Sequence, residues 1–248
     1  MGAIAIVQRA TKPPAIGARP FASDVSRACR APHCARLSTV AASSGSTPGD
    51  PSTSKGPRPF SKEQRDFLDG AIRVNQAGEL AATLIYAAQS PITVKAHPRL
   101  RPLMKHMYDQ EVGHFDTFNK LLAKHRIRPT ALYPVWQVAA TALGWGTAML
   151  GREAAMACTE AVETEIGGHY NSQLRVLLEW VREMEARGED VGDEVKDMVA
   201  TIRRIRDEEL EHLDHAVEND AKLAEGHEIL TAVIRGGCRT AIWVSEKV

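Results

Sequence analysis

Two hexapeptides of this 248-residue chain share one pattern of acidic residues and histidine. Both read Asp-x-Glu-x-x-His, and they place Glu111 three residues before His114 and Glu209 three residues before His212. Residues three apart lie on the same face of a helix, so each glutamate converges with its histidine. A carboxylate oxygen together with an imidazole nitrogen suits iron or manganese. The two motifs therefore predict metal ligands on two separate helices.

A further glutamate precedes each motif on its own stretch of chain. Glu79 lies 32 residues before the glutamate of the first motif, and Glu163 lies 46 residues before that of the second. The order Glu, Glu-x-x-His, Glu, Glu-x-x-His is that of the di-iron carboxylate site in ferritin-like bundles. Four carboxylates would neutralise two divalent ions, whereas four buried glutamates without metal would repel one another. Asp109 and Asp207, which begin the motifs, fit either groups that orient the ligands or exposed acids.

The individual ligands also have simpler interpretations. Glu163 competes with Glu160 and Glu165 for the inward direction, and it is preferred because Tyr170 lies two turns further on, on nearly the same face. The first glutamate, Glu79, could face solvent among its small and apolar neighbours. The two histidines could be hydrogen-bonded core residues, although both together are less readily explained in this way.

The elements that must position these residues read as helices. Ser61, followed closely by Glu63, is a plausible helix start, and apolar residues recur with helical spacing from Phe67 to Ile85. Further helices are expected over about 99–125, 152–185, 190–218 and 225–245. Breakers of regular structure separate them, namely Pro91, Pro98, Pro129, Pro134, Gly188 and Asn219. The sequence predicts an all-α fold, a ferritin-like four-helix bundle with additional helices.

One segment differs from the charged helices around it. Residues 129–151 carry no formal charge and include Trp136 and Trp145, which would suit a membrane interface. Only 135–150 is free of strong interruptions, which is short for a span of about 20 residues. Seven basic groups against three acids lie just upstream, over 99–128. This segment predicts a helix at an anionic membrane surface, and the alternative is a buried crossover helix of the bundle.

The formal net charge of zero averages two unlike parts. Residues 1–60 hold eight basic and two acidic side chains, which leaves 23 basic and 29 acidic groups for the rest. An Arg-rich, Ser-rich, acid-poor N-terminus predicts a mitochondrial transit peptide, with a Gly/Ser/Pro-rich linker over 43–59. The alternative is a disordered basic tail that carries no targeting signal. The overall composition excludes a collagen-like chain and a polytopic membrane protein, and no nucleic-acid partner is expected. Four scattered cysteines fit a reducing compartment.

Several runs of the body, over about residues 65–248, resemble the demethoxyubiquinone hydroxylase family of ubiquinone biosynthesis. They are Arg73–Glu79, Asp109–Glu111, Ala155–Thr159, Val162–Glu163, His169–Asn171, Arg206–His212 and Gly237–Ile242. Two positions depart from the family pattern. Asn75 and Gln76 stand where Asp-His is expected, and Trp243 stands where a phenol is expected. Neither departure removes a metal ligand.

The resemblance implies a ferritin-like di-iron monooxygenase, peripheral to the mitochondrial inner membrane on its matrix side. It would hydroxylate the ring of a polyprenyl benzoquinone that lacks one methoxy group, using O2 and electrons from NADH. A lipid-binding accessory protein is the implied partner, and a homo-oligomer is possible. The residues that carry over are the iron ligands Glu79, Glu111, His114, Glu163, Glu209 and His212, the nearby His169 and Tyr170, and Arg239 and Lys247 for NADH.

Two other classes of protein share part of this pattern. A ferritin-like ferroxidase or rubrerythrin-like peroxidase has the same ligand order but has no use for an interfacial apolar segment. A non-catalytic, membrane-associated helical scaffold would hold no iron.

Overall fold

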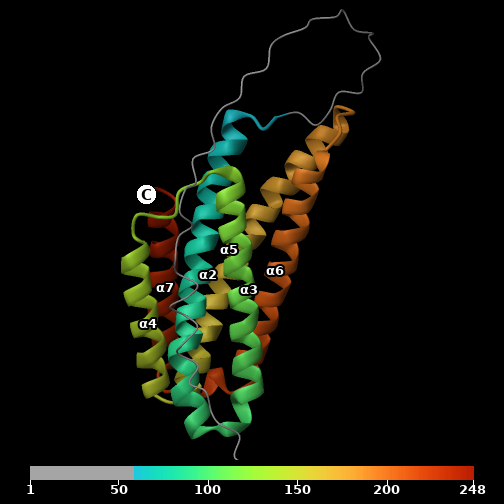
Figure 1. The fold of residues 1–248 in the computed structure, drawn as a ribbon. Coiled ribbons are helices and arrows are strands. Elements are labelled where there is room, and N and C mark those ends of the chain that lie inside the picture. Colours follow the sequence, from blue (N-terminus) through green and yellow to red (C-terminus); the bar gives the residue numbers. More distant parts are fainter. Residues whose placement is uncertain (1–58) are drawn as a thin grey trace, which may run out of the picture. The chain divides into compact units, whose positions relative to one another are not determined.

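Four long helices run side by side in the computed structural model, which describes residues 59–248 (Figure 1). All the regular elements found in this part of the chain are helical. The bundle helices are α2 (Lys62–Ala96), α3 (Arg101–His125), α5 (Arg152–Ala186) and α6 (Gly192–Glu218). The predicted all-α bundle is confirmed, and the expected helix bounds agree with the observed ones to within a few residues.

The start of α2 is fixed by a capping box. The Ser61 side chain accepts a hydrogen bond from the Gln64 amide at 3.2 Å, and the Gln64 side chain accepts one from the Ser61 amide at 2.9 Å. The expectation that Pro91 interrupts the helix is wrong, because α2 continues through it to Ala96. Proline removes one backbone donor, but α2 packs against both α3 and α4, and this packing supports the helix past the missing bond.

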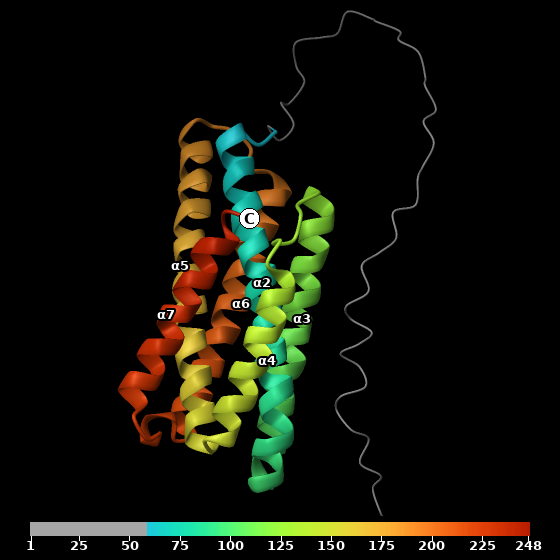
Figure 2. The same ribbon diagram turned by 90° about the vertical axis from the view of Figure 1, so that its left-hand side faces the viewer.

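The chain forms two helical hairpins joined by a crossover. The short helix η2 (Pro98–Leu100) links α2 to α3, and a short turn links α5 to α6. Between the hairpins, α4 (Tyr133–Met149) crosses the outside of the bundle, packed on α2 and α5. After η3 (Ala221–Leu223), α7 (His227–Ser245) packs on α5 and α2, so α4 and α7 cover one side of the bundle (Figure 2). One long crossover is typical of ferritin-like folds.

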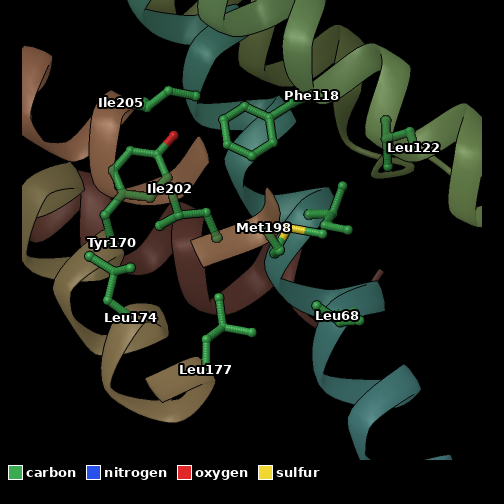
Figure 3. Close-up of a cluster of buried hydrophobic side chains, with 10 residues drawn as sticks. Leu68, Phe118, Leu122, Tyr170, Leu174, Leu177, Met198, Ile202 and Ile205 are labelled. Carbon is green, nitrogen blue, oxygen red and sulfur yellow. The ribbon is translucent and has the colours of Figure 1, made fainter. Parts of the chain in front are cut away.

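Two hydrophobic clusters fill the bundle along its length. All four bundle helices contribute to the first cluster, in which Phe118 stacks on Tyr170 with ring centroids 6.1 Å apart (Figure 3). The second cluster surrounds Tyr86, Met107 and Met156. Buried polar side chains lie between the two clusters, and both tyrosines point a hydroxyl toward them.

The crossover helix α4 has two unlike faces. Its inner face approaches α2 so closely that a Cβ on Gly144 would lie 2.5 Å from the Ile85 carbonyl oxygen. Nearby, the Gln89 side chain donates to the Thr147 hydroxyl at 3.1 Å. Its outer face exposes large apolar side chains, including Val138 and Trp145. The segment is therefore a crossover helix, as the alternative held, but it is not buried as that alternative expected, because its outer face is exposed. The membrane contact remains a prediction.

Within residues 59–248, no helix is both long and apolar enough to cross a membrane. The predicted transit peptide and linker lie outside the described residues except at their last two positions. Of these, Phe60 belongs to the folded body, because its ring lies 6.4 Å from that of Trp180 in α5.

Candidate metal centre

Six buried side chains meet between the two hydrophobic clusters. Each of the four bundle helices contributes to the set: one glutamate from α2, one from α5, and a Glu-x-x-His pair from each of α3 and α6. None of the six residues exposes more than 1% of its surface. They are the six residues predicted from the sequence, Glu79, Glu111, His114, Glu163, Glu209 and His212.

The six residues form two overlapping groups of possible ligands. Glu79 and His114 belong to one group, Glu163 and His212 belong to the other, and Glu111 and Glu209 belong to both. The shared glutamates turn one oxygen toward each histidine. The two oxygens of Glu209 lie 3.0 Å from His114 Nδ1 and 3.2 Å from His212 Nδ1. The two oxygens of Glu111 lie 3.0 Å from His212 Nδ1 and 3.9 Å from His114 Nδ1.

The donor atoms fit a pair of metal ions. Both oxygens of Glu111 and of Glu209, one oxygen of Glu79 and of Glu163, and both histidine Nδ1 atoms are buried without a hydrogen-bond partner. Buried polar atoms normally have a hydrogen-bond partner, so these eight unpaired atoms indicate a ligand-binding site. Two donors at about 2.1 Å from one ion, and at right angles to each other, lie roughly 3 Å apart. Carboxylate and imidazole donors in this ratio suit two iron or manganese ions.

Bringing these buried ionisable groups together would be electrostatically unfavourable without bound cations. Burial, and then the charge of Glu209, raise the pKa of Glu111 and of Glu163 well above the usual range. Burial also opposes ionisation of Glu209, but contacts with the two histidines lower its pKa to about 2. The same contacts with Glu209 and Glu79, against the effect of burial, raise the pKa of His114 to about 12. Two divalent ions would take the place of the protons that these shifts retain.

The outer nitrogen of each histidine is held by the opposite hairpin. His114 Nε2 lies 2.6 Å from the Glu208 carboxylate, which also accepts a hydrogen bond from Arg204 at 2.7 Å. His212 Nε2 lies 2.9 Å from the side-chain oxygen of Gln110. These contacts fix each ring with Nδ1 toward the candidate ions.

The two aspartates considered for this role lie elsewhere. Asp109 is exposed and pairs with Lys105, and Asp207 is exposed and pairs with Arg206. The residues that contact the histidines are the next ones along the chain, Gln110 and Glu208. Helical spacing does distinguish the two positions of each pair, because Gln110 and Glu208 lie four residues before His114 and His212, on the same helix face, whereas each aspartate lies five residues before its histidine.

Two tyrosines hold Glu79 and Glu163, the glutamates that belong to only one ligand group each. Tyr170 donates a hydrogen bond to Glu79, as expected for a residue near the site, and Tyr86 donates one to Glu163 at 3.0 Å. Burial and the surrounding carboxylates raise the pKa of both tyrosines well above the usual range, so both remain donors. The sequence analysis missed Tyr86. The available signal was its position seven residues after Glu79, which matches that of Tyr170 after Glu163.

Asn75 and Gln76, which stand where the family pattern has Asp-His, are buried and make hydrogen bonds with other side chains. Asn75 and Gln173 exchange two side-chain bonds of 2.9 and 2.8 Å, and Gln173 Nε2 lies 2.7 Å from His169 Nε2. Gln76 donates to Asn119 on α3 at 3.1 Å. His169 therefore lies at the outer end of a chain of amides that reaches α2 one turn before Glu79.

The predicted nicotinamide-binding residues lie at the end of α7. Arg239 makes two hydrogen bonds to Glu165, at 2.8 and 2.9 Å. With His169 and Trp243, this pair lines a recess of about 330 Å³ between α5 and α7. Lys247 is exposed beyond the end of α7 and does not line the recess. The structure thus places Arg239 beside a cavity and Lys247 outside it.

A second cavity, of about 340 Å³, lies between α4 and α7 and is almost entirely apolar. Its floor is formed by α2 and α5, on the side of these helices away from the candidate ligands. We refer to it as the α4–α7 cavity. Gly78 and Val162, which directly precede Glu79 and Glu163, belong to its lining. The cavity therefore adjoins the parts of α2 and α5 that bear these two glutamates.

Comparison with known proteins places the chain. Residues 66–245 match the model of the family "Ubiquinone biosynthesis protein COQ7". The chain is 48% identical over 190 residues to the Saccharomyces cerevisiae protein "5-demethoxyubiquinone hydroxylase, mitochondrial", an alignment that covers 76% of this chain and 82% of that protein. It is 41% identical over 201 residues to the Rhodospirillum rubrum "3-demethoxyubiquinol 3-hydroxylase", covering 81% and 82% of the two chains.

A human relative adds information on the electron donor. The chain is 44% identical over 184 residues to "NADPH-dependent 3-demethoxyubiquinone 3-hydroxylase, mitochondrial" of Homo sapiens, covering 74% of this chain and 79% of that protein. That name gives NADPH, whereas the sequence analysis expected NADH. The family match spans all the bundle helices except the first residues of α2. The chain belongs to the COQ7 family of ubiquinone biosynthesis proteins.

Proposed function

We propose that this chain hydroxylates the ring of demethoxyubiquinone, a polyprenyl benzoquinone that lacks one methoxy group, with O2 and electrons from a reduced nicotinamide nucleotide. The observation that carries the proposal is the set of eight unpartnered, buried donor atoms next to an apolar cavity. The six ligands would hold two iron ions, which supply O2 activation when bound. The names of the relatives support the substrate and the reaction.

The protein's own side chains prepare the site for this chemistry. Glu111 and Glu209 would be available to both ions, because each turns one oxygen toward each histidine. Tyr86 orients Glu163, and Tyr170 orients Glu79. The hydrophobic clusters above and below exclude water, which strengthens the electrostatic interactions within the site.

The α4–α7 cavity has the chemistry of a quinone site. Its lining is apolar apart from a few groups such as Ser245, whose hydroxyl accepts a hydrogen bond from Trp136 at 3.0 Å. Its volume lies near the lower end of the range for small-molecule pockets, roughly 300–1,000 Å³. A substituted quinone ring would fit between the two helices, with its prenyl tail leaving along them.

The outer faces of α4 and α7 support a membrane location for this cavity. Large apolar side chains are exposed on both helices, among them Val138 and Trp145 on α4 and Ile229, Val233 and Trp243 on α7. Such a patch marks a protein or membrane contact. We place the enzyme on the matrix side of the mitochondrial inner membrane, where a lipid-binding accessory protein or a second copy could share this face.

The decisive experiment measures iron and turnover on the same sample. Protein reconstituted anaerobically should hold two iron ions per chain and convert demethoxyubiquinone, with incorporation of one oxygen atom from isotopically labelled O2. Parallel assays with NADPH and NADH identify the donor. Glu209→Ala should abolish turnover while helix content persists, because both candidate ions lose a shared ligand. Retained turnover in a protein that binds only one iron ion per chain would contradict the proposal.

The same measurements separate the alternative classes. A ferroxidase or peroxidase would bind iron and oxidise it, or consume peroxide, without converting the quinone. A non-catalytic scaffold would hold no iron after anaerobic reconstitution.

Vesicle flotation tests the membrane contact. The double variant Val138→Glu/Ile229→Glu places two charges on the apolar face and should release the protein from vesicles that contain anionic lipid. Val217→Glu, at an exposed apolar position of α6, is the matched control and should still float. Equal loss for both variants would mean that the α4–α7 face is not the contact.

A further inference from the structure

The α4–α7 cavity is lined by two glycines that lie inside helices. Gly78 lies in α2 and Gly237 lies in α7. On α2 the lining residues run from Val74 to Ile85, and on α7 they run from Val233 to Ser245. Each glycine lies about one turn or more from both limits, so the two glycines line the middle of the cavity, one from α2 and one from α7.

The fold itself does not require glycine at either position. Neither residue has a positive φ. A Cβ on Gly237 would meet no atom within 4 Å, and a Cβ on Gly78 would first meet Ile166 Cδ1 at 3.9 Å, an ordinary van der Waals contact. The situation differs at Gly144, where a Cβ would lie 2.5 Å from backbone. Glycine inside a helix is less favourable than alanine, so neither local conformation nor packing explains these two glycines.

The space that they leave lies in the cavity beside the metal site. Gly78 directly precedes the candidate ligand Glu79, and Ile166 lies one turn after Glu163. A methyl group on either glycine would narrow a cavity of about 340 Å³ that is already small for an organic ligand. A flexible chain can thread a narrower passage than a flat ring that carries methoxy groups.

We propose that Gly78 and Gly237 are specificity-determining residues, which keep the middle of the α4–α7 cavity wide enough for the substituted ring of the quinone. This inference rests on the proposed function and refines it, because it assigns the ring, rather than the tail, to the level of Gly78. The ring then lies beside the helical turn of α2 that bears Glu79.

The chain offers a matched control for each glycine. Gly70 on α2 and Gly236 on α7 are also helical, have no atom within 4 Å of an added Cβ, and do not line the cavity. Gly78→Ala and Gly237→Ala are compared with Gly70→Ala and Gly236→Ala in iron-loaded, full-length protein. The probes are a demethoxybenzoquinone with one isoprene unit and a long-chain alkane diol without a ring. Isothermal titration calorimetry measures the binding of both probes, because an alkane diol, unlike a quinone, does not quench tryptophan fluorescence.

The cavity variants should lose quinone affinity and kcat/KM by roughly 10- to 200-fold, as expected for one methyl group too many in a tight site. The control variants should match the parent in both quantities. Each of the four variants should keep the parent's iron content, and its Tm should be unchanged or higher by about 2–4 °C. The ringless probe should bind the cavity variants as tightly as the parent.

Three results would overturn the inference. The first is equal quinone binding and turnover in the cavity and control variants, which leaves the proposed function intact. The second is a loss of affinity for the ringless probe equal to that for the quinone, which would mean that the added methyl group closes the cavity to any ligand. The third is a parent protein that neither binds nor converts the quinone, which removes the proposed function and this inference with it. Should Gly78→Ala also lose iron, its role would be in metal binding, and Gly237→Ala alone would then decide.

Discussion

The Nε2 atom of His114 lies 2.6 Å from a carboxylate oxygen of Glu208, on the opposite hairpin of the bundle. The equivalent nitrogen of His212 meets the neutral amide oxygen of Gln110 at 2.9 Å. A carboxylate acceptor makes an imidazole a stronger metal ligand than an amide acceptor does. The two halves of the site are therefore similar in geometry but unequal in electrostatics, and the half that contains His114 has the more electron-rich histidine.

Replacing this carboxylate by an amide should weaken one half of the site. Glu208→Gln keeps the shape of the side chain, so the hydrogen bond to His114 persists but its acceptor is neutral. We expect a loss of metal affinity of roughly 10- to 100-fold at the ion that His114 would hold. Competition between the protein and a chromophoric chelator for Co²⁺, used as a spectroscopic substitute for iron, measures this loss. The converse change, Gln110→Glu, should raise the affinity of the other half.

The neighbouring aspartate is the control for this prediction. Asp207→Asn removes an equal charge one residue away, but Asp207 is exposed and pairs with Arg206 rather than with a histidine. Its Co²⁺ affinity should equal that of the parent. A similar loss in Asp207→Asn and Glu208→Gln would show that net surface charge, and not the contact with His114, controls the affinity.

The tyrosine hydroxyls should act on separate halves of the site. Tyr86→Phe removes the hydrogen bond to Glu163, and Tyr170→Phe removes the one to Glu79, while each ring still packs in its cluster. A hydrogen bond to a charged group contributes about 1.5–3 kcal/mol, so each variant should weaken one metal-binding step by roughly tenfold or more. Stepwise Co²⁺ titration resolves the two steps. A loss of both steps in each variant would contradict the assignment.

The helical spacing of the sequence was sufficient to predict the helices and the six residues that converge in the structure. A three-residue spacing on a helix has one geometric outcome, so Glu111 and His114 had to share a face wherever their helix packed. The order of the four ligand-bearing helices then indicated the bundle. Two tyrosines seven residues after a glutamate are part of the same pattern, although only Tyr170 was recognised.

The remaining contacts depend on the relative position of the helices and had no counterpart in the sequence pattern. Each tyrosine bonds the glutamate of the opposite helix rather than that of its own. Each histidine likewise contacts the residue before the opposite motif's glutamate. These contacts are set by the crossing of two hairpins, which local spacing does not determine. For the same reason the sequence predicts a break at Pro91, whereas tertiary packing carries α2 past it.

The close approach of α4 to α2 gives a prediction about stability. Gly144→Ala would place a methyl group 2.5 Å from the Ile85 carbonyl oxygen, so α4 must shift outward. Overpacking of this kind typically costs about 1–3 kcal/mol, which corresponds to a fall in Tm of roughly 2–10 °C for a domain of this size. Gly146→Ala, on the same helix with no atom within 4 Å of the added Cβ, should not lower the Tm. Differential scanning fluorimetry of both variants provides the test, and an equal response would show that α4 does not pack as described.

His169 gives a prediction about pH. Asn75 fixes the orientation of the Gln173 amide, whose nitrogen then donates to His169 Nε2 at 2.7 Å. Because it accepts this hydrogen bond, His169 Nε2 must be unprotonated. Burial accordingly lowers the pKa of His169 to about 4. The unfolded chain, with an ordinary histidine pKa of about 6.5, binds the proton more readily than the folded protein between these two values. The stability that neutral His169 contributes is complete above pH of about 6.5 and is lost as the pH falls toward 4.

Replacement of this histidine should flatten the pH dependence of the unfolding free energy. Between pH 7 and pH 5 the parent should lose about 2 kcal/mol that His169→Gln does not lose, since glutamine has no proton to gain. Urea titrations of both proteins at the two pH values measure the difference, and titrations shared by the two proteins cancel. Identical slopes for the parent and His169→Gln would show that His169 takes up its proton in the folded protein, and hence that the Gln173 amide does not hold its Nε2 atom as an acceptor.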